Sequence, residues 1–274
     1  RPGVLFIETS LEGCLVDESD RRTQVDSFIE FQKSADKEFS VYYERVQSLD
    51  GLSQVLKKCQ IQNRVADIPG KNRKAVKKLE PTNIDYVHIS SHGLRKGLCL
   101  VKDASGREAE PEDIVDSFAY LKGAKVKAII LSACNVGQNG DLAKRIIKKS
   151  GVKAVIGYPN ITYDHICSIA EQLLFYLLLR NTRIRVFDAV RRVNDCLYLL
   201  GENVDRLMVC WTNEPGQITG PHPWFTGDSA QEKSSRSFMS SIQKYIPSRG
   251  RIGEKNLQEL RQILTFTAKR MSEI

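Results

Sequence analysis

The stretches IDYVHISSHG, residues 84–93, and VKAIILSACNVG, residues 126–137, decide the fold that this chain of 274 residues is expected to adopt. Each begins with a nearly continuous apolar run rich in Val and Ile, which is typical of a strand buried on both faces of a parallel sheet. Each run then ends in small and polar residues. Because open α/β sheets place their reacting groups beyond the carboxyl ends of the strands, we expect a functional site at these two ends.

Helical and strand patterns alternate on both sides of these stretches. We predict further strands at residues 4–7, 39–46, 152–157 and 207–211. We predict helices around Leu52 to Leu56, from Pro111 to about Leu121, and over residues 141–149, 166–179 and 186–200. The basic stretch 60–80 is predicted to be an exposed loop with one helical turn. The alternation indicates an α/β fold, with a mostly parallel central sheet flanked by helices on both faces.

The character of the sequence changes near residue 227. Residues 229–241 are polar and rich in Ser, and the apolar residues after them have the spacing of an amphipathic helix. We therefore predict one domain over residues 1–226 and a C-terminal helical extension or linker over residues 227–274. The opening Arg-Pro-Gly, which lacks Met, is interpreted as the start of an excised fragment or a processed product.

Composition and charge exclude several classes of protein. Hydrophobic residues make up 41% of the chain and charged residues 27%, which excludes a collagen-like or largely disordered polypeptide. The formal net charge of +8 predicts a mildly positive surface that attracts acidic polypeptides or nucleic acid at low salt. No phosphate-cradling glycine motif or helix-turn-helix pattern accompanies this charge, so the sequence does not favour direct binding of nucleic acid.

The seven cysteines are odd in number and lack the paired spacing of a zinc site or a disulfide framework. Reduced thiols are the simpler interpretation, and they predict a cytoplasmic location. No apolar run approaches the about 18 residues that a membrane-spanning helix needs. Because Cys is among the most buried residue types, we interpret six of them as core residues: Cys14, Cys59, Cys99, Cys167, Cys196 and Cys210.

Cys134 differs because it follows one predicted strand while His92 follows the strand expected beside it. A cysteine attacks a carbonyl carbon as the thiolate, and a nearby imidazole favours that ionisation and protonates the leaving amine. Gly93 has no Cβ, so its backbone can approach a substrate, and its N–H with that of Cys134 would hold an oxyanion. His88 lies inside the strand and is interpreted as a core residue.

Three blocks of the sequence resemble the CHAT group of caspase-like cysteine peptidases, relatives of separase, gingipain and legumain. They are YVHISSHG (86–93), LSACNVG (131–137) and the segment from Val155 to Tyr158 leading into Asp164. The resemblance covers roughly residues 80–215. It implies a caspase-like three-layer sandwich, a catalytic dyad of His92 and Cys134, Gly93 as an oxyanion donor, and no metal or other cofactor. The block Ser-Ala-Cys-Asn-Val-Gly differs from the Gln-Ala-Cys-Arg-Gly of true caspases, so their preference for aspartate is not carried over.

Asp164 is the candidate residue for substrate selection. Relatives that cleave after Arg or Lys place an acidic group in the loop that follows the strand after the cysteine, where Asp164 lies. A carboxylate facing a guanidinium forms a charge-assisted contact, so cleavage after a basic residue is our hypothesis. The alternative is that Asp164 is the N-cap of the helix predicted to begin near residue 166. Asp141 is interpreted in the same way, as a helix cap.

The expected function is a cysteine endopeptidase that hydrolyses peptide bonds in a protein substrate and is regulated by a partner or an attached sensor module. Neither a membrane nor a metal enters this expectation. The first alternative is a peptidase-shaped interaction module that is latent or inactive. The second is a nucleic-acid-binding domain, which only the net charge suggests.

Overall fold

A computed structural model describes most of the chain up to residue 213. It covers residues 2–9, 39–66, 83–91, 93–94, 97–98, 100, 102, 109–138, 140–159, 164–181, 183–199 and 207–213. The predictions for His92, for residues 67–80 and for the extension 227–274 therefore lie outside the described residues. The chain forms two compact units, of which the first contains the sheet with helices α2 to α4 and the second contains helices α5 and α6.

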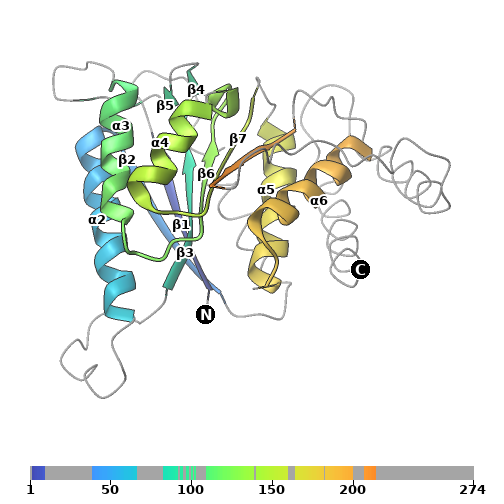
Figure 1. Ribbon diagram of the computed structural model, residues 1–274, viewed down its shortest axis with the longest axis horizontal. Helices are drawn as coiled ribbons and strands as arrows, with labels where there is room; N and C mark the ends of the chain where they lie inside the picture. The colour runs from blue at the N-terminus through green and yellow to red at the C-terminus, as the bar shows by residue number, and fades with distance from the viewer. Residues whose placement is uncertain are drawn as a thin grey trace. The chain divides into compact units, whose positions relative to one another are not determined.

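The first unit is built on a six-stranded sheet with the order β2-β1-β3-β6-β7-β8 (Figure 1). The strands are β1 (Pro2–Thr9), β2 (Ser40–Val46), β3 (Asn83–Ser90), β6 (Ala128–Ser132), β7 (Ala154–Gly157) and β8 (Val209–Thr212). The first five strands in this order pair in parallel, and β8 pairs antiparallel with β7. The predicted α/β class with a mostly parallel sheet is thus confirmed.

Three helices pack on one face of this sheet: α2 (Leu49–Ala66), α3 (Pro111–Ser117), which continues as the 3-10 turn η2 (Phe118–Leu121), and α4 (Gly140–Ser150). One hydrophobic core joins this face to the helices. The sheet contributes Leu5, Val87, Ile129 and Val155, which are fully or almost fully buried. Since each Cβ along a strand alternates between the two faces, these residues share a single face.

The opposite face of the central strands is also apolar. Val4, Phe6, Ile130 and Ile156 are buried there, as expected for strands whose sequences do not alternate with polar residues. His88 is only 5% exposed, and its ring lies 4.8 Å from that of Phe6, measured between ring centroids. The prediction that His88 is a core residue is confirmed.

The second unit contains α5 (Asp164–Arg180) and α6 (Val186–Leu199), which pack against each other. Both helices were predicted from the apolar composition of their segments. The run from Leu173 to Leu179 in α5 is buried without interruption. No helix within the described residues is both long and apolar enough to cross a membrane.

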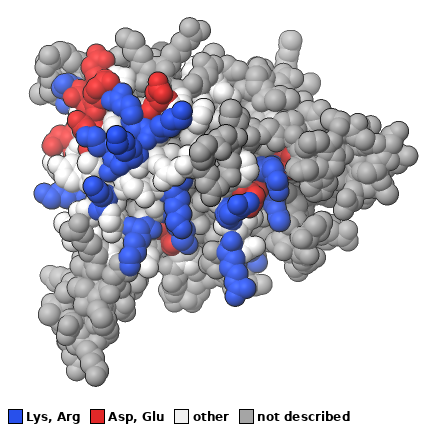
Figure 2. Space-filling view, viewed as in Figure 1, with Lys and Arg blue, Asp and Glu red and all other residues white. Residues whose placement is uncertain are grey.

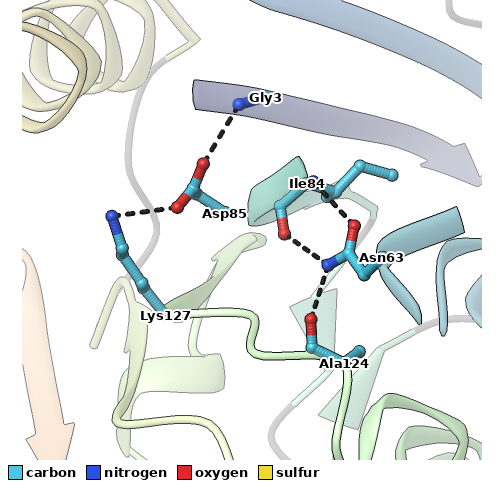
Figure 3. A network of polar contacts seen from close by, with 6 residues as sticks. All are labelled: Gly3, Asn63, Ile84, Asp85, Ala124 and Lys127. Carbon is cyan, nitrogen blue, oxygen red and sulfur yellow. Dashed lines mark hydrogen bonds and ion pairs between the residues drawn. The ribbon is translucent and has the colours of Figure 1, made fainter. Parts of the chain in front are cut away.

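The predicted loop over residues 60–80 is wrong at its start, because α2 continues to Ala66. Asn63, which is 3% exposed, extends the buried side of the helix beyond Cys59. Its Nδ2 donates hydrogen bonds to the carbonyl oxygens of Ile84 (2.8 Å) and Ala124 (2.6 Å), and its Oδ1 accepts one from the N–H of Ile84 (2.8 Å) (Figure 3). A polar residue therefore takes the place of an apolar one on the core side.

Two further predictions need correction. Asp141 lies inside the first turn of α4, which begins at Gly140, so it is not the N-cap, although a carboxylate there still favours the helix dipole. Similarly, α5 begins at Asp164 itself, two residues before the predicted start. Helix ends are the least certain feature of a sequence pattern because fraying and capping shift them by one or two residues.

Candidate active site

The strands that precede His92 and Cys134 are direct neighbours in the sheet. β3 and β6 pair in parallel with Ser90 opposite Ser132. Beyond the last pair, the N–H of Ser91 donates a hydrogen bond to the carbonyl oxygen of Ser132 over 3.2 Å. The residue immediately before His92 is therefore tied to the residue two positions before Cys134, and the predicted adjacency of the two strands is confirmed. His92 itself lies outside the described residues.

Cys134 lies in a tight turn that begins where β6 ends. The N–H of Ala133 donates to the carbonyl oxygen of Leu131 over 2.9 Å, which closes a three-residue turn. Asn135 then adopts a φ of 62°, in the left-handed region that Asn tolerates better than most residues with a side chain. Val136 follows and is buried in the core. The Cys134 side chain is therefore partly exposed, while Ala133 before it and Val136 after it are buried.

Gly137 fixes this turn to the end of the next strand. Its N–H donates to the carbonyl oxygen of Tyr158 over 2.8 Å. A Cβ on Gly137 would lie 2.7 Å from the carbonyl carbon of Tyr158, 2.8 Å from the nitrogen of Pro159 and 2.9 Å from the carbonyl carbon of Gly157. All three are backbone atoms, which cannot rotate away as a flexible side chain can. Only glycine fits at position 137 without moving the cysteine turn or the end of β7.

The residue after the histidine is held in a small hairpin. Gly93 begins β4 (Gly93–Leu94), which pairs antiparallel with β5 (Gly97–Leu98), so that Gly93 lies opposite Leu98. Leu98 and Leu100 are buried in the core of the first unit. The chain that leaves β3 therefore turns back at the carboxyl end of the sheet and is anchored by these two leucines.

Asp164 is the first residue of α5 and belongs to the second compact unit. Its side chain lies outside the described part of the chain. Its proposed contact with a substrate residue thus stays a prediction, and the interpretation as a cap is replaced by a position within the first turn.

The described cysteines fall into two groups. Cys59, Cys196 and Cys210 are buried, and burial raises the pKa of each thiol to about 12. Cys134 and Cys167 are half-buried and therefore accessible to solvent. The prediction of a core position is confirmed for the first three and is wrong for Cys167. Since a nucleophilic thiolate must be reached by the substrate, the partial exposure of Cys134 agrees with the role predicted for it.

Glu8 is a charged group at the same edge of the sheet that the sequence interpretation missed. It ends the apolar run of β1, is 8% exposed, and lies opposite Ser90 of β3 in the register. Its carboxylate accepts a hydrogen bond from the hydroxyl of Tyr43 on β2. An acidic residue directly after four apolar ones was the available signal, because a buried carboxylate is rare unless it is hydrogen-bonded.

The donor groups of the described residues do not form a metal site, since they contain no group of three or more His, Cys, Asp or Glu side chains that could hold an ion. No protein-family model matches the chain, and no curated protein is similar to it in sequence.

Proposed function

We propose that this chain is a cysteine endopeptidase of the caspase-like CHAT type, with Cys134 as the nucleophile and His92 as the proton-transfer group. The observation that supports it most directly is the hydrogen bond from Ser91 to Ser132 at the paired ends of β3 and β6. In the sequence, His92 directly follows Ser91, and Cys134 lies two residues after Ser132. Such a pair is the minimum required for thiolate attack on a peptide carbonyl.

The proposed reaction has two halves. The Cys134 thiolate forms a C–S bond to the carbonyl carbon, and the C–N bond breaks as the imidazolium of His92 gives its proton to the leaving amine. Water, deprotonated by the now neutral imidazole, then attacks the thioester and releases the acid and the thiolate. The N–H groups of Gly93 and Cys134 would stabilise the oxyanion in both halves. The proposal needs no metal or other cofactor.

The proposal also includes a caspase-like arrangement of layers, a role for the C-terminal extension and a cellular compartment. A caspase-like sandwich has three layers, and the sheet with helices α2 to α4 supplies two of them. Residues 227–274 would form the helical extension that connects the peptidase to a regulatory partner or sensor module. The five described cysteines are free thiols, which suits a reducing compartment such as the cytoplasm.

The test compares variants at Cys134 and Cys167, the two described cysteines that are half-buried. Cys134→Ala is expected to abolish peptide cleavage, whereas Cys167→Ala, which removes the other half-buried thiol, is expected to retain it. Alkylation near neutral pH followed by peptide mapping should modify Cys134 in the native protein. Undiminished cleavage by a folded Cys134→Ala protein would refute the assignment. Labelling of Cys134 without any cleavage would indicate the latent interaction module instead.

The substrate preference is tested separately. Peptides that differ only in Arg, Lys, Asp or Leu before the scissile bond are compared with wild-type protein and with Asp164→Asn. We expect faster cleavage after Arg and Lys, and a selective loss of that preference in Asp164→Asn because the charge-assisted contact is removed. A preference for Asp in the wild-type protein would contradict the hypothesis while leaving the dyad intact.

A further inference from the structure

The connections that enter β6 and β7 are both rich in lysine. Lys122, Lys125 and Lys127 lead into β6, and Lys148, Lys149 and Lys153 lead into β7. The N–H of Lys153 donates to the carbonyl oxygen of Lys127 over 3.1 Å, so the two connections lie side by side. We call these six residues the lysine edge. In Figure 2 some of the basic side chains at the lower border of the described surface lie where Figure 1 shows the amino ends of the strands.

Only part of this charge is neutralised within the protein. Lys127 forms an ion pair with Asp85 over 2.9 Å, and Asp85 also accepts a hydrogen bond from the N–H of Gly3 (Figure 3). Lys149 forms an ion pair with Asp116 over 2.7 Å. Lys122, Lys148 and Lys153 are exposed and form no ion pair with any described residue. The lysine edge therefore keeps a local positive excess.

The fold itself accounts for only some of these lysines. Lys148 and Lys149 lie in the last turn of α4, where a positive charge favours the helix dipole. Lys122 and Lys153 lie in the connections, outside any helix or strand, and contribute to neither the core nor a described ion pair. Their charge is thus available to a partner.

An exposed aromatic ring adjoins the same connection. Tyr120 in η2 is 41% exposed and lies two residues before Lys122, and η2 packs against α4, which carries Lys148. Lysines act as point charges that suit phosphates without demanding a fixed geometry. A basic surface with an exposed aromatic ring is the combination by which proteins bind single strands, since bases stack on the ring while the backbone follows the charge.

We infer that the lysine edge, with Tyr120, binds single-stranded nucleic acid without sequence preference. We favour nucleic acid over an acidic protein segment because of charge density. A phosphodiester backbone carries a negative charge on every unit, whereas an acidic segment of a protein rarely does. This surface lies at the amino ends of β6 and β7, the opposite end of the sheet from the turn that carries Cys134. The inference does not depend on the proposed peptidase activity. The fold shows where part of the net positive charge of the sequence is concentrated.

The experiment measures binding of a short fluorescent single strand to the whole chain by anisotropy, between about 50 and about 200 mM salt. Lys122→Glu/Lys153→Glu is expected to weaken binding at least about tenfold and to make the slope of log K against log salt shallower by about 1.4, because each phosphate contact contributes about 0.7. Lys57→Glu/Lys58→Glu, at exposed positions of α2, changes the net charge equally and is the control for net charge, although it also removes the ion pair of Lys58 with Glu44. It is expected to change binding less than threefold, as a rough guide.

The contribution of the ring is tested with Tyr120→Ser. This variant is expected to weaken binding of the single strand about tenfold, and to leave binding of a duplex of equal length nearly unchanged, because paired bases are not free to stack on the ring. Three results would overturn the inference: no binding at low salt, equal losses in the two double variants, or tighter binding of polyglutamate than of the oligonucleotide at equal charge. The last result would assign the surface to an acidic protein segment.

Discussion

Gly137 holds the turn that carries the candidate nucleophile against the end of β7. We predict that Gly137→Ala lowers peptide cleavage by at least about tenfold, since a displacement of about 1 Å costs up to about a hundredfold in the rate of an enzyme-bound reaction. We also expect it to slow the alkylation of Cys134. The reason is that the new Cβ would lie 2.7 Å from the carbonyl carbon of Tyr158 and must push the turn away from β7. Alkylation is measured by mass spectrometry and needs no knowledge of the substrate.

Gly123→Ala provides the control for this change. Gly123 has a φ of +80° with nothing within 4 Å of the added Cβ, so its replacement introduces backbone strain of about 1–2 kcal/mol without a steric clash. It lies in the connection before β6, at the other end of that strand from Cys134. If both glycine variants slow alkylation of Cys134 equally, the effect comes from lost stability, and the role assigned to Gly137 is wrong.

At the scale of elements, Asn63 joins three segments that are distant in the sequence. Its side chain bonds α2 to the start of β3 and to the connection before β6, 21 and 61 residues away (Figure 3). Asn63→Ala leaves the N–H and the carbonyl of Ile84 and the carbonyl of Ala124 without this partner. Each buried polar group that loses its hydrogen bond costs about 1–3 kcal/mol, so we predict a loss of about 3 kcal/mol in the free energy of unfolding.

Gln60→Ala is the matched variant on the same helix. Gln60 also donates one side-chain hydrogen bond to a carbonyl, that of Lys122 over 2.9 Å, but at an exposed position where water replaces the lost partner. We expect a change below about 0.5 kcal/mol, measured with Asn63→Ala by urea unfolding at one pH. A similar small loss for both would show that the Asn63 bonds do not hold the three segments together.

These elements also show how far the sequence could predict the fold. β3 and β6 follow from their apolar runs because burial on both faces leaves a local pattern. The end of α2 does not, because Asn63 breaks the apolar spacing and is satisfied only by partners brought close by the fold. The direction of β8 was likewise not predicted, since an antiparallel strand at the edge has the same composition as a parallel one.

The features of the candidate site can also be separated into those that the sequence predicts and those that only the fold shows. Cys134 and the neighbouring strand ends were predicted, because a cysteine and a histidine that follow apolar runs are visible in the sequence. The contact of Gly137 with Tyr158 and the burial of Glu8 beside Ser90 were not, since both arise from segments paired across the sheet. The Gly137 contact holds the turn of Cys134 against the end of β7, and Glu8 lies on β1, two strands away from β6 at the same edge of the sheet.

At the scale of the whole molecule, the two ends of the parallel sheet carry different groups. The amino ends hold the ion pair of Asp85 with Lys127 and the bonds of Asn63, which connect the strands to the helices that cover them. The carboxyl ends hold the turn of Cys134 and the hairpin that begins at Gly93. Substitutions of the buried polar groups at the amino ends, such as Asn63, are therefore expected to change stability, and substitutions in the turn of Cys134 to change reactivity.

Three of the described cysteines are buried, and they predict how the free energy of unfolding responds to alkaline pH. In the folded protein the pKa of Cys59, Cys196 and Cys210 is raised to about 12, whereas in the unfolded chain each thiol ionises near its usual value of about 9. Between these two values the unfolded state binds fewer protons than the folded state. The free energy of unfolding should therefore fall as the pH rises above about 9, by up to about 1.4 kcal/mol per pH unit for each thiol, and the loss is complete near pH 12.

Cys196→Ala isolates one of these thiols, because the lysines and tyrosines that also titrate in this range are common to both proteins. At neutral pH the variant should be less stable than the wild type, since it removes a buried sulfur. The gap between the two should narrow steadily from pH 9 toward pH 12, as the wild type alone loses the stability that its protonated, buried thiol contributed. Denaturant unfolding at a series of pH values measures this gap, and a gap that stays constant across that range would mean that Cys196 ionises as readily in the folded protein as in the unfolded chain.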